Sequence, residues 1–369
     1  MNNASEQHSA TPTGAFEARM SDRMERAGAP SVAIAVVHAD RTVWQGARGV
    51  ANAITGEAAT PETAYLWFSM TKIATATAIM QLVETGVIAL DTPARTYLPD
   101  VIELSDRVSV RHLLNHSSGI GNPLPLRWVH RVDHPGPDPR QMLRRLLARH
   151  GKLHFAPGTR AAYTNVGYLV LGEVITAASG IPYRRYVVEQ LLRPLGARST
   201  GFAYPPDLAA AVGHHARFDP LLPILHLMLP KGIVDGAARR FRVCNPFYVD
   251  GSAYGGLIGP VTDAARLVAA HLNGGRVGDA RILTPESTTA MQHIETPGKK
   301  YDLGFGWFRE HADSTRGLRY VEHLGGGAGF ASIMRLHPDR QLGFVVMANA
   351  TRFNRQQIVT LIEQREWSR

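Results

Sequence analysis

The stretch LWFSMTK at residues 66–72 decides how this chain is interpreted, together with the helix that it opens. Apolar residues recur at three- and four-residue steps from Met70 to Val83, and Gly86 follows the run. This spacing predicts a helix with one face in the core. Ser69 would then lie at the helix start, where free backbone N–H groups and the positive end of the dipole favour negative charge.

Ser69 and Lys72 are three residues apart, so their side chains would lie one turn apart on the same helix face. Only five of the 40 basic residues are lysines, and the rest are arginines. An arginine keeps its proton in proteins, whereas a buried lysine can release it and act as a base. The pair therefore predicts a nucleophilic hydroxyl beside a base. The alternative is a serine that caps the helix and a lysine that extends to solvent.

The bulk composition is that of a globular protein of one large domain or two joined domains, with 369 residues, 44% hydrophobic and 19% charged. The net charge of +9 raises the question of nucleic acid. The arginines are scattered, however, and their densest cluster, at residues 140–149, lies on one predicted helix. We therefore expect a solvated basic face and no nucleic-acid partner. The single cysteine, Cys244, excludes an internal disulfide.

No apolar run reaches transmembrane length, and the first 30 residues lack the apolar core of a signal peptide. A cytoplasmic location is the expectation, although a processed periplasmic or secreted form would have the same sequence. The 16 histidines include no H-E-x-x-H run, so we expect no metal and no cofactor. The sequence also lacks the G-x-S-x-G motif of α/β-hydrolases.

Strand patterns occur at both ends of the chain and helical patterns dominate between residues 61 and 290. Strands are predicted at 31–38, 42–49, 303–309, 318–323, 331–336 and 341–348, and terminal helices at 15–27 and 354–366. This order predicts an α+β fold, in which an antiparallel sheet from both termini is flanked by helices and carries a mostly helical insertion. A site is expected where the two parts meet.

In this architecture residues 15–365 form one catalytic unit, with an α/β part at 15–65 and 295–369 and a mostly helical part at 66–294. Residues 1–14 are polar and are predicted to be a disordered tail. The segment 214–250 contains an apolar run, LLPILHLMLP at 221–230, that is too short to span a bilayer. This segment could be a lid, part of an acyl pocket, a membrane-surface contact, a dimer contact or buried core. A homo-oligomer built on the segment 214–250 is compatible with the sequence.

Tyr163 and Asn165 form a second candidate group, just before an apolar helix predicted over 166–177. Because they are two residues apart, their side chains point the same way if the backbone is extended or looped. A phenol near an ammonium group can ionise and relay protons, and an amide can orient a substrate carbonyl or the lysine. The alternative is a buried tyrosine followed by an asparagine that caps the helix.

The sequence HLGGG at residues 323–327 follows a strand pattern and forms a third group. Glycines let a backbone approach a ligand closely, so the N–H of Gly326 can pair with that of Ser69 as an oxyanion hole. The alternative is a glycine turn between strands, with His323 on the surface.

Taken in order, the S-x-x-K, Y-x-N and glycine-bearing strand motifs resemble the serine β-lactamase and penicillin-binding-protein superfamily. The resemblance is closest to the class C β-lactamase-like branch, with its family VIII-type esterases, and runs from about residue 15 to 365. Supporting stretches lie at 113–119, 157–158, 255–256, 304–307 and 347–349.

The resemblance implies a role for each matched residue. Ser69 would be the acylated nucleophile, Lys72 its proton acceptor and Tyr163 the proton relay. The N–H groups of Ser69 and Gly326 would form the oxyanion hole. The residues implied in substrate binding are Asn165, His323 and Gly325.

His323 stands where β-lactamases and transpeptidases usually have the lysine of Lys-Thr-Gly, and Leu324 replaces the threonine. Recognition of a substrate carboxylate is weakened as a result, by about 1–3 kcal/mol. Arg316 and Arg319 are candidates to compensate.

The sequence therefore favours a carboxylesterase that acts on neutral short- or medium-chain esters through an acyl-enzyme, with weak β-lactamase activity. The partner would be a small-molecule ester or amide substrate. A β-lactamase, a D-amino-acid peptidase or an acyltransferase on the same fold stays open. A catalytically weak binding or scaffold protein is the alternative of another class, and the intact set of catalytic residue types argues against it.

Overall fold

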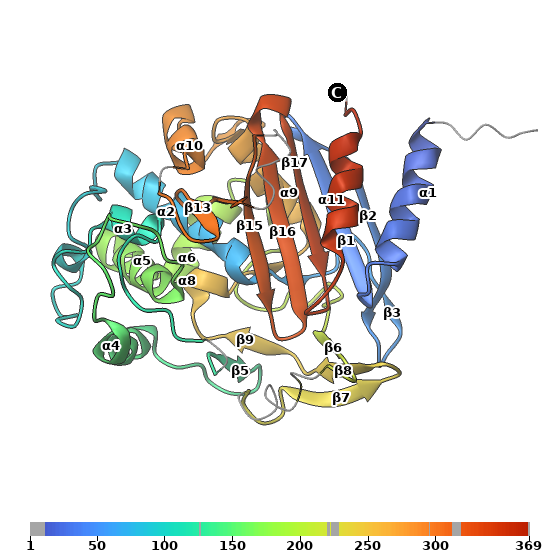
Figure 1. Cartoon of the computed structure of the whole chain (residues 1–369), viewed down its shortest axis with the longest axis horizontal. Coiled ribbons are helices and arrows are strands. Elements are labelled where there is room, and N and C mark those ends of the chain that lie inside the picture. The colour runs from blue at the N-terminus through green and yellow to red at the C-terminus, as the bar shows by residue number, and fades with distance from the viewer. Residues whose placement is uncertain are drawn as a thin grey trace, which may run out of the picture.

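Strands from both ends of the chain form one antiparallel sheet of eight strands, in the order β13-β14-β15-β16-β17-β1-β2-β3 (Figure 1). The computed structural model describes residues 12–124, 127–219, 222, 229–294, 296–311 and 319–367. The strands of the sheet are β1 (Ser31–His38), β2 (Arg41–Asn52), β3 (Glu57–Ala58), β13 (Tyr301–Leu303), β14 (Phe308–Glu310), β15 (Val321–Gly327), β16 (Phe330–His337) and β17 (Leu342–Ala348). The predicted α+β fold is confirmed.

β1 joins the two ends of the chain, because it pairs with β2 on one side and with β17 on the other. Its side chains from Val32 to Val37 are apolar and buried on both faces. Ile34 and Val36 pack into a cluster with α1 (Pro12–Glu25) and α11 (Arg355–Gln364), whereas Ala35 faces the main core of the molecule. A strand that is covered on both faces reads as a continuous apolar run, which is why the sequence predicted β1 correctly.

Helices cover both faces of the sheet. α1 and α11 lie on one face, and α9 (Val261–Leu272) packs on the other face against β1 and β17 (Figure 1). The division of the chain at residue 294 had grouped α9 with the mostly helical part, but its contacts are with the sheet. The predicted tail over 1–14 is wrong for residues 12–14, which lie in α1, and residues 1–11 are outside the described part of the chain.

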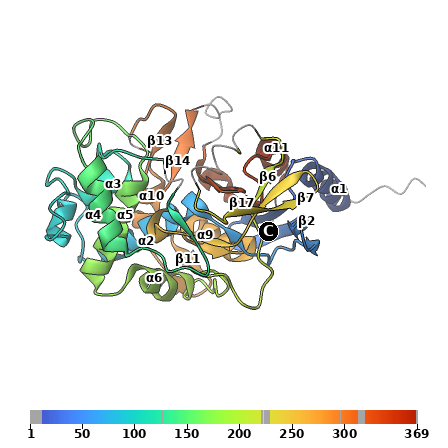
Figure 2. The ribbon, with the colours of Figure 1, turned by 90° about the horizontal axis from the view of Figure 1, so that it is seen from below.

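The remaining helices gather at one end of the sheet, and Figure 2 shows α3, α4 and α5 at the end opposite α1. They are α2 (Thr71–Glu84), α3 (Val110–Leu114), α4 (Pro139–His150), α5 (Asn165–Ser179), α6 (Tyr183–Tyr186), α8 (Ser252–Gly255) and α10 (Pro285–Gln292), with the short helical turns η1 (Phe68–Met70), η2 (Ala94–Tyr97) and η3 (Val187–Leu192). A further short turn, η5 (Pro338–Arg340), connects β16 to β17 within the sheet. α2 runs through the middle of this group and contacts α5, α8 and α10, so its side chains are buried almost all round. This burial places the residues at its start inside the protein.

Short strands interrupt the helical part and were not predicted from the sequence. They form the pairs β4 (Tyr65–Leu66) with β10 (Ile258–Gly259), β5 (Val129–Arg131) with β9 (Phe247–Val249), β11 (Arg276–Val277) with β12 (Ala280–Arg281), and a three-stranded sheet of β6 (His214–Ala216), β8 (Phe241–Cys244) and β7 (Val234–Ala238). The segment 214–250 therefore contains a small sheet. Of its apolar run at 221–230, only residues 222, 229 and 230 are among those described.

The C-terminal strands follow the prediction with two corrections. The strand expected at 318–323 is β15, which runs from Val321 to Gly327, so the glycines expected to follow a strand lie within it. The single strand expected at 303–309 is a hairpin of β13 and β14, because Gly306 has a left-handed backbone (φ 76°) in the turn between them. Within the described residues, no single helix is long and apolar enough to cross a bilayer. Taken together, α5 and the helix over 183–192 are long and apolar enough, but the chain bends by 80° between them.

Candidate active site

Ser69 lies in the η1 turn between β4 and α2, and Phe68 immediately before it has a left-handed backbone with φ 48°. This conformation is strained for a residue with a side chain and persists only where the surroundings fix it. The Phe68 ring lies 6.3 Å from the ring of Phe247 and 6.1 Å from that of Phe330, both from other elements. Packing from β9 and β16 therefore holds the turn that carries Ser69.

Lys72 is fully buried, and its Nζ has three partners. Nζ donates to Asn165 Oδ1 at 2.9 Å and to the Tyr254 carbonyl at 2.9 Å, and it lies 3.3 Å from Ser69 Oγ. Burial holds the pKa of Lys72 well below its ordinary value. A neutral amine has two hydrogens and one lone pair. Since the amide and carbonyl oxygens take both hydrogens, the lone pair is left for the Ser69 hydroxyl.

Three tyrosine rings surround the Lys72 amine. Nζ lies 4.9 Å from the ring centre of Tyr163, 5.4 Å from that of Tyr168 and 5.1 Å from that of Tyr254. These rings exclude water from the amine, and desolvation is the cause of its lowered pKa. The surroundings of Lys72 therefore favour its neutral form.

The Tyr163 hydroxyl forms a hydrogen bond with the Ser69 side chain, and burial raises the pKa of Tyr163 above its ordinary value. Both groups of the pair are therefore neutral in this state. A phenol near an ammonium group can ionise, but the raised pKa of Tyr163 favours its neutral form here. A neutral phenol can still pass protons, because it both donates and accepts a hydrogen bond.

Asn165 is the first residue of α5, and its side chain reaches Lys72. Its own backbone N–H donates to Asn122 Oδ1 at 2.9 Å, so a neighbouring loop caps this helix end. The two side chains of the Y-x-N motif thus both reach the Ser69–Lys72 pair, as their spacing predicted.

β15 closes the site from the sheet side. β14 pairs with β15 at Phe308–Glu322, and beyond this pair the edge of β15 faces the η1 turn. A Cβ atom on Gly325 would lie 2.2 Å from the Trp67 carbonyl oxygen, so only glycine allows this approach. Gly326 is exposed and has room for a Cβ atom, whose nearest neighbour would be 3.7 Å away.

His323 is buried beneath the site, with 1% of its surface exposed. Burial lowers the pKa of His323 to about 3. Its Nδ1 lies 2.7 Å from the Leu324 carbonyl, which can only accept, so Nδ1 carries the single proton. Of the two arginines considered as substitutes for a cation here, Arg319 is exposed and pairs with Asp339 at 3.4 Å, and Arg316 is outside the described residues.

Comparison with known proteins identifies the family. Residues 16–365 match the Beta-lactamase family. The chain belongs to the β-lactamase family. As such it is a serine hydrolase of the β-lactamase and penicillin-binding-protein fold.

Individual relatives of this β-lactamase-family chain differ in their named activities. Esterase EstB of Burkholderia gladioli is 31% identical over 82% of this chain and 80% of its own length. The D-alanyl-D-alanine-carboxypeptidase/endopeptidase AmpH of Escherichia coli is 26% identical over 77% of this chain and 71% of its own. The octameric penicillin-binding protein homologue from Pyrococcus abyssi has a TM-score of 0.73 at 25% identity, over 92% of this chain and 74% of its own. These relatives support hydrolase chemistry and leave the ester or amide class open.

Three contributors to this β-lactamase-family site were not singled out from the sequence: the Tyr254 carbonyl, Tyr168 and His116. His116 stacks on the Tyr163 ring at 4.5 Å. Its stretch at 113–119 and the glycines after Tyr254 were noted as supporting matches, but a backbone carbonyl has no sequence signal of its own. Among the described residues, no group of three or more His, Cys, Asp or Glu could hold a metal ion.

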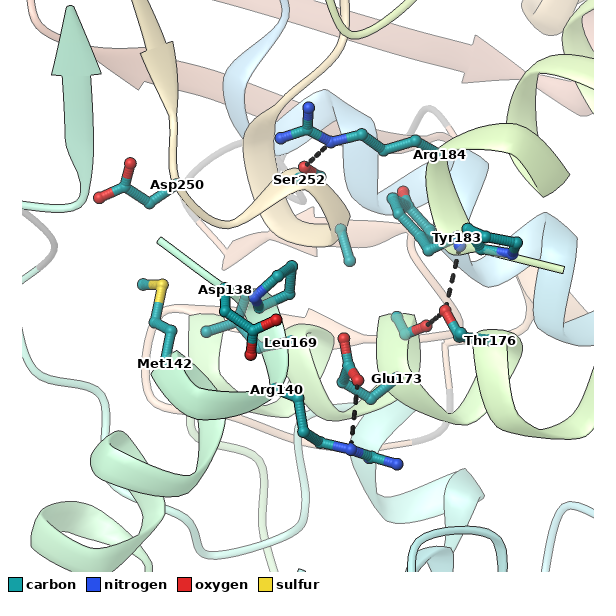
Figure 3. Close-up of a pocket in the computed structure, with 14 residues that line it drawn as sticks. Asp138, Arg140, Met142, Leu169, Glu173, Thr176, Tyr183, Arg184, Asp250 and Ser252 are labelled. Carbon is teal, nitrogen blue, oxygen red and sulfur yellow. Dashed lines mark hydrogen bonds and ion pairs between the residues drawn. The ribbon is translucent and has the colours of Figure 1, made fainter. Parts of the chain in front are cut away.

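A separate cavity of about 310 Å³ lies between α4, α5, α6 and α8 (Figure 3). Its lining includes none of the Ser69, Lys72, Tyr163 group. Its charged side chains are partnered, since Arg140 pairs with Glu173 at 3.5 Å and Arg184 donates to Ser252 Oγ at 2.7 Å. The cavity and the Ser69 site are therefore two distinct regions that share α5 and α8.

Proposed function

We propose that this β-lactamase-family chain is a carboxylesterase that hydrolyses neutral short- or medium-chain esters through an acyl-enzyme on Ser69. The observation that carries the proposal is the buried Lys72, whose lone pair is left for the Ser69 hydroxyl once Asn165 and the Tyr254 carbonyl have taken its hydrogens. A base that is unprotonated near neutral pH is what activation of a serine requires.

In the proposed acylation, Ser69 Oγ attacks the ester carbonyl carbon while its proton moves to Lys72 Nζ. The negative charge that develops on the carbonyl oxygen is stabilised by the N–H groups of Ser69 and Gly326. The tetrahedral intermediate then breaks the bond to the alcohol oxygen. That oxygen takes the proton from Lys72 through the Tyr163 hydroxyl, and the acyl group remains on Ser69.

In the proposed deacylation, a water molecule attacks the acyl carbonyl and passes its proton through Tyr163 toward Lys72. The bond between the acyl carbon and Ser69 Oγ breaks, Ser69 regains its proton, and the carboxylic acid leaves. Asn165 orients both the lysine and the substrate carbonyl in this scheme. On the β15 side we assign substrate binding to Gly325 and His323, whose buried ring lies 6.1 Å from that of Tyr163.

The preference for a neutral ester rests on charge. His323 occupies the position of the usual lysine and is held neutral by burial, since its pKa is about 3. The Lys72 amine is also held neutral. A substrate carboxylate at this site would lose water without gaining a charged partner, which is unfavourable. The similarity to Esterase EstB supports the same choice.

A second candidate is hydrolysis of D-amino-acid peptides, which the similarity to AmpH favours. The experiment that separates the candidates is a set of steady-state rates on p-nitrophenyl butyrate, a chromogenic cephalosporin and a D-alanyl-D-alanine peptide, for the wild type and Ser69→Ala. We expect the highest kcat/KM on the ester and loss of all Ser69-dependent turnover in the variant. A peptide rate above the ester rate would favour the second candidate. No turnover of any of the three would favour a binding or scaffold role.

A further inference from the structure

His116 has a left-handed backbone, with φ 58°, and is buried with 2% of its surface exposed. A residue with a side chain rarely adopts this conformation, and it persists only where the surroundings hold it. His116 follows α3 and lies against Tyr163, which is in the segment just before α5. Strained backbone beside a reactive group often has a functional role.

His116 makes two hydrogen bonds that bracket Tyr163. Its carbonyl accepts from the Ala162 N–H at 2.9 Å, and its Nδ1 accepts from the Thr164 N–H at 3.1 Å. Thr164 is extended, with φ −140° and ψ 130°. In an extended chain, N–H groups two residues apart point to the same side. His116 thus accepts hydrogen bonds from both backbone N–H groups that flank Tyr163, as a neighbouring strand would in a sheet.

The imidazole also packs on the ring that it positions. Its centre lies 4.5 Å from that of Tyr163, with 28° between the planes, and 5.0 Å from that of Tyr168. Because Nδ1 accepts a hydrogen bond, the proton of the neutral ring must be on Nε2. Burial holds the pKa of His116 well below its ordinary value, so the ring stays neutral and Nδ1 keeps its lone pair.

We propose that His116 is a positioning residue, which holds residues 162–164 so that the Tyr163 hydroxyl meets Ser69. This inference rests on the proposed function, since it gives Tyr163 the role of proton relay. His116 lies outside the three motifs. Its strained backbone, its Nδ1 lone pair and its ring face would all serve to hold Tyr163 in position.

Esters with different leaving groups can test whether His116 acts through Tyr163. An alkyl ester releases an alkoxide, which needs a proton as its bond to the acyl carbon breaks, whereas p-nitrophenolate leaves without one. If His116 acts through Tyr163, its loss slows an alkyl ester more than a nitrophenyl ester. A general loss of fold or of Ser69 reactivity would slow both esters equally.

Two variants distinguish the hydrogen bond accepted by His116 Nδ1 from the packing of its ring. His116→Phe keeps a ring but removes the acceptor for Thr164. His116→Asn places an amide oxygen where Nδ1 was and tolerates a left-handed backbone, but loses the ring, so it is the variant that folds if Phe does not. His112→Phe is the matched control, because His112 Nδ1 likewise accepts a backbone N–H, that of Ser109 at 3.2 Å, one turn earlier.

The measurement is kcat/KM on ethyl butyrate and on p-nitrophenyl butyrate, with active sites counted by fluorophosphonate labelling of Ser69. We expect His116→Phe to lower the ethyl ester rate by about 30-fold and the nitrophenyl ester rate by about threefold. His116→Asn should retain more of the ethyl ester rate than His116→Phe, and His112→Phe should change neither ester by more than about twofold.

A double-mutant cycle then tests whether His116 acts through Tyr163. In a Tyr163→Phe background, His116→Phe should lower the ethyl ester rate no further. Equal losses on both esters, or a loss as large in the Tyr163→Phe background as in the wild type, would overturn the positioning role and leave the proposed function intact. A wild type that is not labelled and turns over neither ester would overturn the proposed function, and the positioning role with it.

Discussion

The Ser69 site and the cavity of Figure 3 share α5 and α8, but their side chains differ in charge. The partners of Lys72 at the Ser69 site are neutral, whereas the cavity lining includes charged side chains. At the Ser69 site, Lys72 contacts a hydroxyl, an amide oxygen, a carbonyl and tyrosine rings, all neutral. The cavity is lined by carboxylates and guanidinium groups, among them Glu173 and Arg140, which pair with each other.

This difference supports the proposal that the chemistry takes place at the Ser69 site. A carboxylate beside Lys72 would stabilise the ammonium form and raise its pKa, so the amine would cease to be a base near neutral pH. The one charged residue of α5, Glu173, instead lines the cavity, as does Asp250 just before α8. The reactive group is distinguished by desolvation without an opposite charge.

The largest expected effect comes from removing the base. Lys72→Met should lower turnover of p-nitrophenyl butyrate by about 1000-fold, because the Ser69 proton then has no acceptor. Lys72→Arg should lose as much, since arginine keeps its proton. Steady-state kinetics measure both, and Arg184→Met at the cavity is the control that should stay within about threefold. A comparable loss in Arg184→Met would show that the two regions are not functionally separate.

The second effect is on stability and its pH dependence. The folded pKa of Lys72 is below its unfolded value, so between the two the unfolded chain binds a proton that the folded chain does not. The free energy of unfolding of the wild type should therefore rise with pH relative to Lys72→Met, by up to about 1.4 kcal/mol per pH unit between pH 7 and 9. Urea unfolding of both proteins at both pH values measures the difference. A constant difference would mean that Lys72 keeps its proton in the folded state.

The third effect tests how closely the sheet approaches the η1 turn. A Cβ atom at Gly325 meets the Trp67 carbonyl, so Gly325→Ala should cost about 1–3 kcal/mol of unfolding free energy and displace β15 from Ser69. Gly326→Ala has room for the added methyl group and should cost less than about 1 kcal/mol. Urea unfolding of the pair measures the contrast, and equal costs would place the β15 contact elsewhere.

The smallest effect concerns substrate charge. His323→Lys should raise the ratio of cephalosporin to ester turnover by about tenfold, because an ammonium group can attract the lactam carboxylate. The ratio of the two kcat/KM values is the measurement. An unchanged ratio would show that recognition of the carboxylate is decided at another position, with the 214–250 segment as the next region to alter.

Much of the architecture was predictable because its signals are strong. The apolar β1 and the three motifs around Ser69, Tyr163 and His323 fixed the fold class and the residues that meet. Other features have no such signal. The Tyr254 carbonyl is a backbone atom, and strands of two or three residues such as β4 are too short for periodicity.

The protonation states also required the structure. A phenol can ionise beside an ammonium group, but burial raises the pKa of Tyr163 and lowers that of Lys72, so the neutral form of each is favoured. The role of His116 depends on a positive φ and on contacts with residues 162 and 164, which are distant in sequence. Desolvation and long-range contacts are properties of the folded chain.

The central claim is that Ser69, activated by a neutral Lys72, carries the acyl group of a neutral ester. The most direct test is the intact mass of the protein quenched during its first turnover of p-nitrophenyl butyrate, followed by peptide mapping. The account predicts a mass increase of one butyryl group on Ser69 in the wild type and none in Ser69→Ala. A butyryl group on another residue, or an equal increase in Ser69→Ala, would contradict it.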